Sequence, residues 1–322
     1  MTHTFTQELT EKTRKLGFRT ATIMADLLCI SEDAAYRRLR NPQSLRADEM
    51  ILLAKEFKID LNKFSHPENN WLSGQLKTLN FENYTSNDFY SELEARLDHC
   101  IFQSHSHITY GAKEIPMFYY MWFPTLAQFK NFIWNREFLK QPELNKSQFQ
   151  SKPSDFKWMK LAEKYLKIAS HEIWGYETLY STLYQIYHYK ESGMFVDDRT
   201  YLTVLKEYDQ LINLIYRQAE LGRKLNPYLD EYMGARYKLY FTPMITTDNS
   251  IIFHTIKDKI AVICSQMSGV VFSEAPHWVY STENWLETCK ENGTLISKTG
   301  QSARNKFLIQ DYGSKKQMLN LY

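Results

Sequence analysis

This chain has few cysteines and no long apolar segment. Its 322 residues include four cysteines, Cys29, Cys100, Cys264 and Cys289, and no CxxC pair. Such isolated cysteines exclude a disulfide framework and favour free thiols in a reducing compartment. The longest apolar run, Met117–Phe123, is far shorter than the roughly 20 residues that span a bilayer, and the first residues lack the apolar core of a signal peptide. We therefore expect a cytoplasmic protein that does not enter a membrane.

A strong charge of one sign and the common catalytic signatures are also missing. The net charge is only +2, so any contact with nucleic acid needs a local patch of cations. The sequence contains no GxSxG nucleophile motif, no glycine-rich phosphate loop, no dinucleotide-binding fingerprint and no HExxH metal motif. These absences predict a protein that is not an enzyme and that carries no cofactor and no metal.

The first 64 residues have the pattern of several short helices. Glycine, proline and asparagine interrupt this pattern in the segments GFR and NPQSL, where helices are expected to end. The segment 65–75 is polar and contains Pro67 and Gly74, which predicts a linker. The sequence therefore predicts one domain over residues 1–64 and another over residues 76–322. Four helices are expected in the first domain, over residues 5–16, 20–28, 31–40 and 47–57.

The third of these helices has two unlike faces. Ser31 stands at its start, where a hydroxyl caps free backbone N–H groups. Ala35 and Leu39 point to one side, which allows close packing against the preceding helix. The i, i+3, i+4, i+7 spacing places four polar residues on the opposite face: Asp33, Tyr36, Arg37 and Arg40. Close packing behind and long hydrogen-bond donors in front are what a helix needs to read the DNA major groove.

These segments carry a family resemblance. The run Thr20–Arg40 resembles a helix-turn-helix unit, and Cys29–Arg40 (CISEDAAYRRLR) resembles the second half of Fis-type units. The segment Ser44–Phe64 is similar to the fourth and fifth helices of lambda-repressor-like domains. The resemblance implies a bundle of four or five helices that binds double-stranded DNA. In this family the turn usually carries a glycine in a left-handed conformation, and here Cys29 takes that place.

The resemblance also implies which side chains contact DNA. Arg37 is expected to contact base edges with help from Tyr36 and Ser31, while Asp33 accepts a hydrogen bond from a cytosine amino group or orients Arg37. Five further residues are expected to contact phosphates, which position a protein without specifying a sequence: Arg38, Arg40, Arg46, Thr20 and Thr22. Residues 1–64 contain 11 Lys and Arg against 9 Asp and Glu, so one copy should bind weakly and a homodimer is expected.

The remainder of the chain is expected to be a larger helical domain, which makes the protein mainly α, and α+β overall. Helical spacing runs through residues 158–192 and 197–225 and predicts two long amphipathic helices, the second capped by Asp197. Pro124 should kink or break an apolar helix. Short runs with a period of two follow over about residues 237–273 and predict a small antiparallel β-meander near the C-terminus. Further helices are expected to close the chain.

A group of histidines allows two interpretations. His105 and His107 would share one face of a strand, and His99 with Cys100 lies one short segment earlier. These residues either contribute to a metal site, which would need a third or fourth ligand, or are ordinary polar residues where a helix gives way to a strand.

Two other segments also allow two interpretations each. The aromatic residues within 117–138 and 172–189 either line an apolar ligand pocket or form the stripes by which helices pack together. The loop 291–306 is rich in hydroxyl groups and contains Arg304. It either binds an anion at a helix N-terminus or is closed by its own hydrogen bonds.

The second domain has a resemblance of its own. Residues 112–134, 172–189 and 293–307 resemble matching segments of uncharacterised bacterial proteins of this length that begin with a helix-turn-helix. With the N-terminal unit, this resemblance covers most of the chain. It implies a transcription regulator whose second domain senses a small-molecule effector or mediates dimerisation. The alternative is a non-enzymatic protein-interaction scaffold whose N-terminal bundle does not bind DNA.

Overall fold

The computed structural model describes residues 4–57, 59–61, 64, 75–77, 85–152, 158–243, 248–256, 258–265 and 269–322. Contacts divide the chain into two units, Met1–Ser73 and Gly74–Tyr322. Of the segment 65–75, where the sequence predicts a linker, all residues but Gln75 lie outside the described ones.

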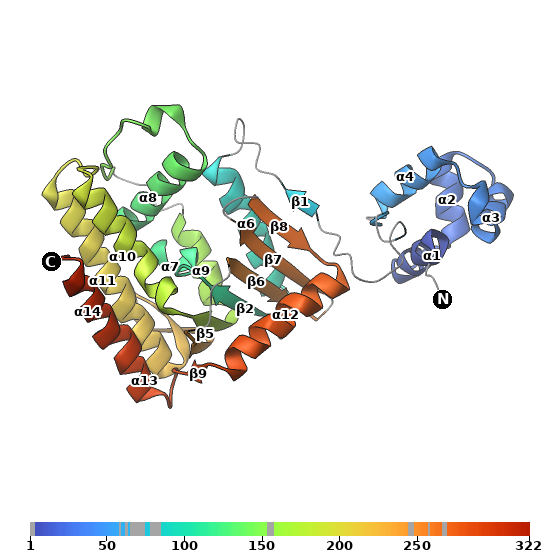
Figure 1. Ribbon diagram of the computed structural model, residues 1–322. Helices are drawn as coiled ribbons and strands as arrows, with labels where there is room; N and C mark the ends of the chain where they lie inside the picture. The colour runs from blue at the N-terminus through green and yellow to red at the C-terminus, as the bar shows by residue number, and fades with distance from the viewer. Residues whose placement is uncertain are drawn as a thin grey trace. The chain divides into compact units, whose positions relative to one another are not determined.

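Four short helices around one core make up most of the described part of the first unit (Figure 1). They are α1 (Phe5–Lys15), α2 (Thr20–Leu28), α3 (Glu32–Arg40) and α4 (Ala47–Glu56). The four helices predicted for this region are thus confirmed. A 3₁₀ turn over Pro42–Ser44 joins α3 to α4. The fifth helix implied by the resemblance falls partly on residues outside the described ranges.

Local sequence signals set where these helices begin and end. Thr4 and Gln7 form a capping box at the start of α1, in which each side chain accepts a hydrogen bond from the other residue's backbone N–H. Gly17 follows α1 with a φ of 81°, a conformation that glycine adopts without strain. The core then forms from apolar side chains of every helix, and four of them have no exposed surface: Leu9, Met24, Ala35 and Leu53.

One mixed β-sheet occupies the centre of the second unit. Its strands follow the order β1-β8-β7-β6-β2-β3-β5-β4, and β9 pairs with β5. Strands β2, β3 and β5 are mutually parallel, and the other pairs are antiparallel. The bounds are β1 Gln75–Lys77, β2 His107–Ala112, β3 Ala169–Trp174, β4 Arg223–Asn226, β5 Leu229–Phe241, β6 Asn249–His254, β7 Lys259–Ser265, β8 Gly269–Ser273 and β9 Thr294–Leu295.

The α+β class is confirmed, but the sheet is larger than the predicted C-terminal meander. Strands β6, β7 and β8 do pair in succession, as predicted. Strand β5 does not join them, because β2 and β3 lie between β5 and β6. The two inserted strands come from much earlier in the chain. Parallel strands at the centre of a sheet are buried on both faces, so their sequences lack the strict alternation that reveals a half-exposed strand.

The prediction of one long helix over residues 158–192 is wrong. This segment contains α9 (Met159–Leu166), then β3, then α10 (Tyr176–Glu191). The strand was hidden because Ser170 and Glu172, which look like solvent-facing positions, are completely buried. The apolar spacing of the helices on either side also continues through the strand.

Most helices of the second unit follow the remaining signals, but the helix predicted over residues 197–225 is too long: α11 ends at Leu221, left-handed Gly222 follows it, and Arg223–Asn226 form β4. Pro124 is the first residue of α8, so the predicted break is confirmed. Asp197 caps α11 by accepting a hydrogen bond of 2.7 Å from the Thr200 N–H, also as predicted. The bounds not yet given are α6 Ser86–Ile101, α7 Met117–Tyr120, α8 Pro124–Ile133, α11 Asp198–Leu221, α12 Pro276–Glu291, α13 Gln301–Asn305 and α14 Tyr312–Met318. A π-helical segment, Lys306–Asp311, joins α13 to α14.

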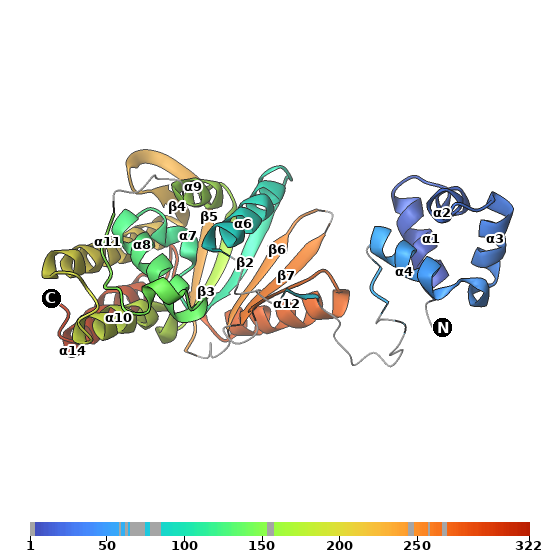
Figure 2. The same ribbon diagram turned by 90° about the horizontal axis from the view of Figure 1, so that it is seen from above.

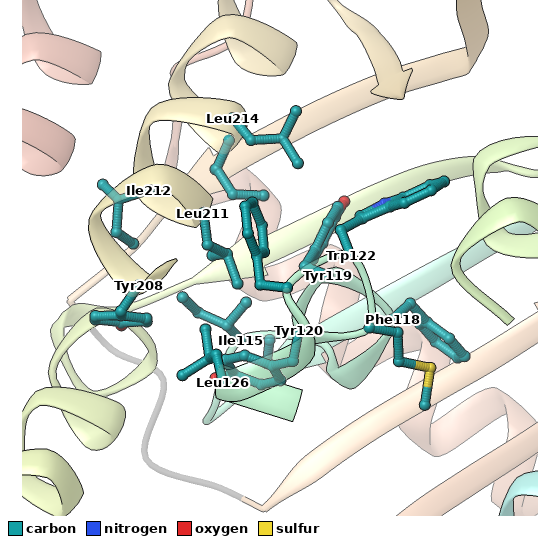
Figure 3. Packing of buried hydrophobic residues seen from close by; sticks show 14 of the residues in the cluster. Ile115, Phe118, Tyr119, Tyr120, Trp122, Leu126, Tyr208, Leu211, Ile212 and Leu214 are labelled. Carbon is teal, nitrogen blue, oxygen red and sulfur yellow. The ribbon is translucent and has the colours of Figure 1, made fainter. Parts of the chain in front are cut away.

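Helices cover both faces of the sheet. Seen from above, α6 and α12 lie on opposite sides of it (Figure 2). The α12 side has a small core that contains Ile173, Ile252 and Leu286. The other side has the main core, where side chains of α7 and α8 meet those of α11 (Figure 3). Most aromatic residues of segment 117–138 belong to this core, which favours the packing interpretation of that segment.

Candidate nucleic-acid interface and histidine pocket

The turn between α2 and α3 has the geometry that usually requires glycine. Cys29 ends α2 in the left-handed region, with a φ of 53° and a ψ of 45°. The N–H of Ile30 donates a 3.0 Å hydrogen bond to the carbonyl oxygen of Ala25, the long bond of a Schellman motif. The side chain of Ile30 packs against the core of the first unit. Cys29 therefore adopts the conformation expected of the missing glycine, at a cost of roughly 1 kcal/mol.

Helix α3 packs on the bundle through its small residues. Ala35 has no exposed surface, and Leu39 is partly buried against the same core. Ser31 caps the helix, because its Oγ accepts a 3.2 Å hydrogen bond from the Ala34 N–H. The back of α3 and its start are thus arranged as the sequence predicts.

The opposite face of α3 is exposed. Asp33, Arg37 and Arg40 are exposed, and Tyr36 has 45% of its surface accessible. Within the described part of the chain, neither Arg37 nor Arg40 forms an ion pair with an acidic side chain. These two guanidinium groups therefore have donors that remain available to an anionic partner.

Arg38 lies at the flank of α3 and is held by α4. Its Nη2 and Nε donate hydrogen bonds of 2.8 and 2.9 Å to the two carboxylate oxygens of Glu49. Hydrogen bonds from Arg38 lower the pKa of Glu49, so the carboxylate stays ionised. Glu49 also accepts a 3.0 Å bond from the backbone N–H of Arg46, the residue before α4. This network fixes the distance between α3 and the start of α4.

The other three residues predicted to contact phosphate are placed differently from one another. Thr20 shares a 2.6 Å hydrogen bond with Thr13 of α1. The Thr22 hydroxyl donates to the carboxylate of Glu32, at 2.7 Å. Arg46 has 72% of its side chain exposed and lies 3.1 Å from Asp48. All three lie on the same bundle as α3, but only Arg46 extends well into solvent.

A pocket of about 380 Å³ lies in the second unit at one end of the sheet. Four histidines line it: His105, His107, His171 and His254. The imidazole rings of His107 and His254 are stacked with centroids 4.1 Å apart, and the ring of His171 lies 5.5 Å from that of His107. The other lining residues are Thr109, Thr255, Ile256, Lys259, Glu283, Glu287 and Lys290, the last four on β7 and α12.

The sequence pointed to only part of this pocket. His107 begins β2, but His105 precedes the strand with a φ of 61°, so the two do not continue one strand face. His171 and His254 were missed, because they reach His107 only through the pairing of β2 with β3 and β6. No local sequence pattern reveals such a pairing. Among the described residues, no group of three or more His, Cys, Asp or Glu has the arrangement needed to hold a metal ion.

Burial keeps three of the pocket histidines, His107, His171 and His254, uncharged at neutral pH. Burial lowers the pKa of His254 to about 3 and the pKa of His171 to about 4, and it also lowers the pKa of His107. Nε2 of His254 lies 3.1 Å from the hydroxyl of Thr109. Each ring therefore presents one N–H donor and one nitrogen acceptor.

Two other polar clusters of the second unit are buried. Glu172 has no exposed surface, and its Oε1 accepts hydrogen bonds from Tyr119 and Tyr165, at 2.6 and 2.7 Å. Lys224 lies over the Tyr165 ring, and burial lowers the pKa of Lys224 to about 7.

The second cluster surrounds Arg304 in the loop 291–306. Arg304 is only 2% exposed and donates hydrogen bonds to the carbonyl oxygens of Ile296 and Lys298. These bonds favour the interpretation of 291–306 as a loop closed by its own hydrogen bonds.

In comparisons with known proteins, no protein-family model, no curated protein and no solved structure matches the chain. Among the residues that the structure describes, no helix is both long enough and apolar enough to span a bilayer.

Proposed function

We propose that this chain is a DNA-binding transcription regulator whose helix α3 enters the major groove. The observation that carries the proposal is the contrast between the two sides of α3. Ala35 is completely buried on one side, while Tyr36, Arg37 and Arg40 are exposed on the other. A helix held this closely to its bundle presents its outer side chains in a fixed geometry, which base recognition requires.

The exposed residues divide into two roles. Arg37 is the base-contacting residue, because its guanidinium can donate two hydrogen bonds to guanine. Tyr36, Ser31 and Asp33 assist at the same edge, and Asp33 accepts from a cytosine amino group or orients Arg37. The phosphate contacts come from Arg40, Arg46, Thr20 and Thr22. Arg38 contributes with the N–H groups that Glu49 does not occupy, from a position fixed by that pair.

A homodimer is part of the proposal. The excess of cations in residues 1–64 is small, and most DNA affinity comes from phosphate neutralisation. Two copies bound to half-sites about one helical turn apart double the number of such contacts. The second unit then mediates dimerisation or binds a small-molecule effector. Binding of the effector would change the spacing of the two α3 helices in the dimer and thereby the affinity for DNA.

The test is the salt dependence of binding to genomic DNA by the purified full chain. We expect the logarithm of the affinity to fall linearly with the logarithm of salt concentration. Arg37→Ala combined with Arg40→Ala should weaken binding at least about tenfold, since each contact contributes about 1–3 kcal/mol. Lys15→Ala combined with Lys55→Ala is the control, because it removes the same charge from α1 and α4. Affinity without salt dependence, and equal in both double variants, would contradict the proposal.

A specific observation also favours the alternative of a protein-interaction scaffold. Four apolar residues of the first unit are more than 40% exposed: Leu16, Phe18, Ile51 and Leu52. Exposed apolar residues of this kind favour contact with another protein. The scaffold becomes the better account if Ile51→Ser together with Leu52→Ser abolishes assembly while the two α3 arginines can be removed without any effect on DNA affinity.

A further inference from the structure

The register of the sheet gathers basic side chains into a row. On the face that α12 covers, His254 of β6 stands opposite both His107 of β2 and Lys259 of β7. One strand further on, His171 of β3 stands opposite Lys238 of β5. Strands β2 and β3 are themselves paired, so four strand pairings bring imidazole and ammonium groups together from five different strands. The pocket lies over the part of this row that contains His107, His171, His254 and Lys259.

We propose that this pocket binds a small molecule through an oxyanion group, a phosphate, sulfate or carboxylate, and that the imidazoles and lysines are its ligands. The inference goes beyond DNA binding and does not depend on it, because it uses only side chains of the second unit. A volume of about 380 Å³ is within the range of small-molecule sites and leaves room for an organic part beside the oxyanion.

Charges around the pocket favour an anion. Lys290 on α12 lowers the pKa of His107, His171 and His254. Lys259 lowers the pKa of His107 and His254, and Lys238 lowers that of His171. Two acidic groups act in the opposite direction. Glu283 opposes these effects at His107 and Glu287 opposes them at His171, each less than Lys290 does. The imidazoles thus lie in a positive potential, which attracts an anion.

The two carboxylates are already engaged with lysines. Both oxygens of Glu283 lie 2.8 Å from Nζ of Lys259, and Glu287 pairs with Lys290. Each lysine has three N–H donors, so both can retain these partners and still donate to an oxyanion. The imidazole N–H groups supply further donors around the pocket. The Thr109 hydroxyl is paired with Nε2 of His254, and the Thr255 hydroxyl donates to Asp258.

Binding should be coupled to proton uptake. The imidazoles are neutral without a ligand, and an anion in contact with them favours the charged form and raises their pKa. The titratable groups that line the pocket are His105, His107, His171, His254, Lys259, Glu283, Glu287 and Lys290, and Lys238 on β5 acts on His171 from beside it. The imidazoles of His107, His171 and His254 are the groups on which the bound anion acts in this way. Affinity should therefore rise as pH falls, by up to about tenfold per pH unit for each proton taken up.

The test uses sulfate, whose charge does not change in this pH range, and phenyl phosphate, with the full chain and no DNA. Calorimetric titrations from about pH 7.5 to about pH 5.5 measure the affinity, at constant ionic strength in chloride. Histidine-selective NMR follows each imidazole. We expect sulfate to raise the pKa of His107, His171 and His254 and to leave the exposed His188 and His277 unchanged. Tighter binding of phenyl phosphate than of sulfate would show an organic phosphate to be the better ligand; the reverse would indicate free inorganic oxyanions.

Variants decide whether the pocket residues are responsible. His107→Gln combined with His171→Gln should make the pH dependence markedly shallower, because only His254 of the three imidazoles is left to take up a proton. Lys259→Gln, at an exposed position that tolerates change, should weaken sulfate binding about tenfold. The control is Lys113→Gln, just beyond the other end of β2, where the lysine pairs with Asp248. The proposal is overturned if neither anion binds, if anion binding is the same in all variants, or if Zn²⁺ binds the histidines and sulfate does not. Because no DNA is present, failure here leaves the proposed function untouched.

Discussion

The guanidinium of Arg38 and the carboxylate of Glu49 form a two-bonded ion pair that joins α3 to α4, with N–O distances of 2.8 and 2.9 Å. Side-chain exposures of 22% and 12% place this pair between the surface and the core. Such a position makes the pair a structural link between the helix proposed to contact DNA and the rest of its bundle.

Loss of this link should loosen α3. We expect Arg38→Met or Glu49→Gln to lower the free energy of unfolding of the first unit by about 1–3 kcal/mol, because a partly buried charged group loses its partner. Hydrogen-exchange mass spectrometry of the full chain measures this as faster exchange of the α3 amides. Arg37→Met, at an exposed position on the same helix, is the control. Equal exchange rates in the Arg38 and Arg37 variants would show that the pair has no structural role.

Replacing Cys29 by glycine should stabilise the first unit. Cys29 has a left-handed backbone with a φ of 53°, which glycine adopts without steric cost. The gain should be about 0.5–1 kcal/mol, since relief of the strain exceeds the entropy that glycine adds to the unfolded chain. Urea unfolding measures the change, and Cys29→Ala, which keeps the strain, should show no gain. A destabilised Cys29→Gly protein would contradict the conformation described for this turn.

A larger residue at position 35 should displace α3. Ala35 has no exposed surface and lies in the bundle core, so Ala35→Leu forces a shift that costs about 1–3 kcal/mol. DNA binding should weaken together with stability, because the outer face of α3 moves. Ala34→Leu, at the half-buried flank of the same helix, should have a smaller effect on both. If Ala35→Leu leaves both stability and DNA affinity intact, close packing of α3 is not what positions it.

Acid should destabilise the second unit through its histidines. The folded-state pKa of His254 is about 3 and that of His171 about 4, both below the ordinary value of 6.5. Below about pH 6.5 the unfolded chain therefore binds protons that the folded chain does not, and stability falls with pH by at most about 1.4 kcal/mol per unit for each histidine. Urea unfolding at several pH values measures the slope. His254→Gln should make this slope shallower. An unchanged slope would show that His254 does not cause the loss of stability in acid.

The first unit was predictable because its signals are local. Each helix of this unit spans only a few turns. Gly17 marks where α1 ends, and Ser31 marks where α3 begins. The spacing of Ala35 and Arg37 on α3 is likewise a property of consecutive residues. The nine residues predicted to contact DNA all lie on this unit, although the ion pair of Arg38 with Glu49 was not foreseen. It joins residues of two helices and leaves no trace in the helical pattern of either.

The second unit was less predictable because its organisation depends on distant pairings. The sequence predicts helix where β3 forms, because Glu172 looks like a surface residue although it is buried among tyrosine hydroxyls. The histidine pocket could not be assembled from the sequence, because His107 and His171 meet only through the parallel pairing of β2 with β3. A sequence shows which residues alternate along a strand, but not which strand lies beside it.

The most direct test of the central claim is selection of binding sites from fragmented genomic DNA, with the purified wild-type chain beside Arg37→Ala. If α3 reads base edges, the wild type should enrich a defined two-fold related motif with half-sites about one helical turn apart. Arg37→Ala should lose the preference at one position of each half-site while it still binds DNA. The claim that α3 reads base edges would be contradicted if the wild type enriched no motif, or if the wild type and Arg37→Ala enriched the same motif.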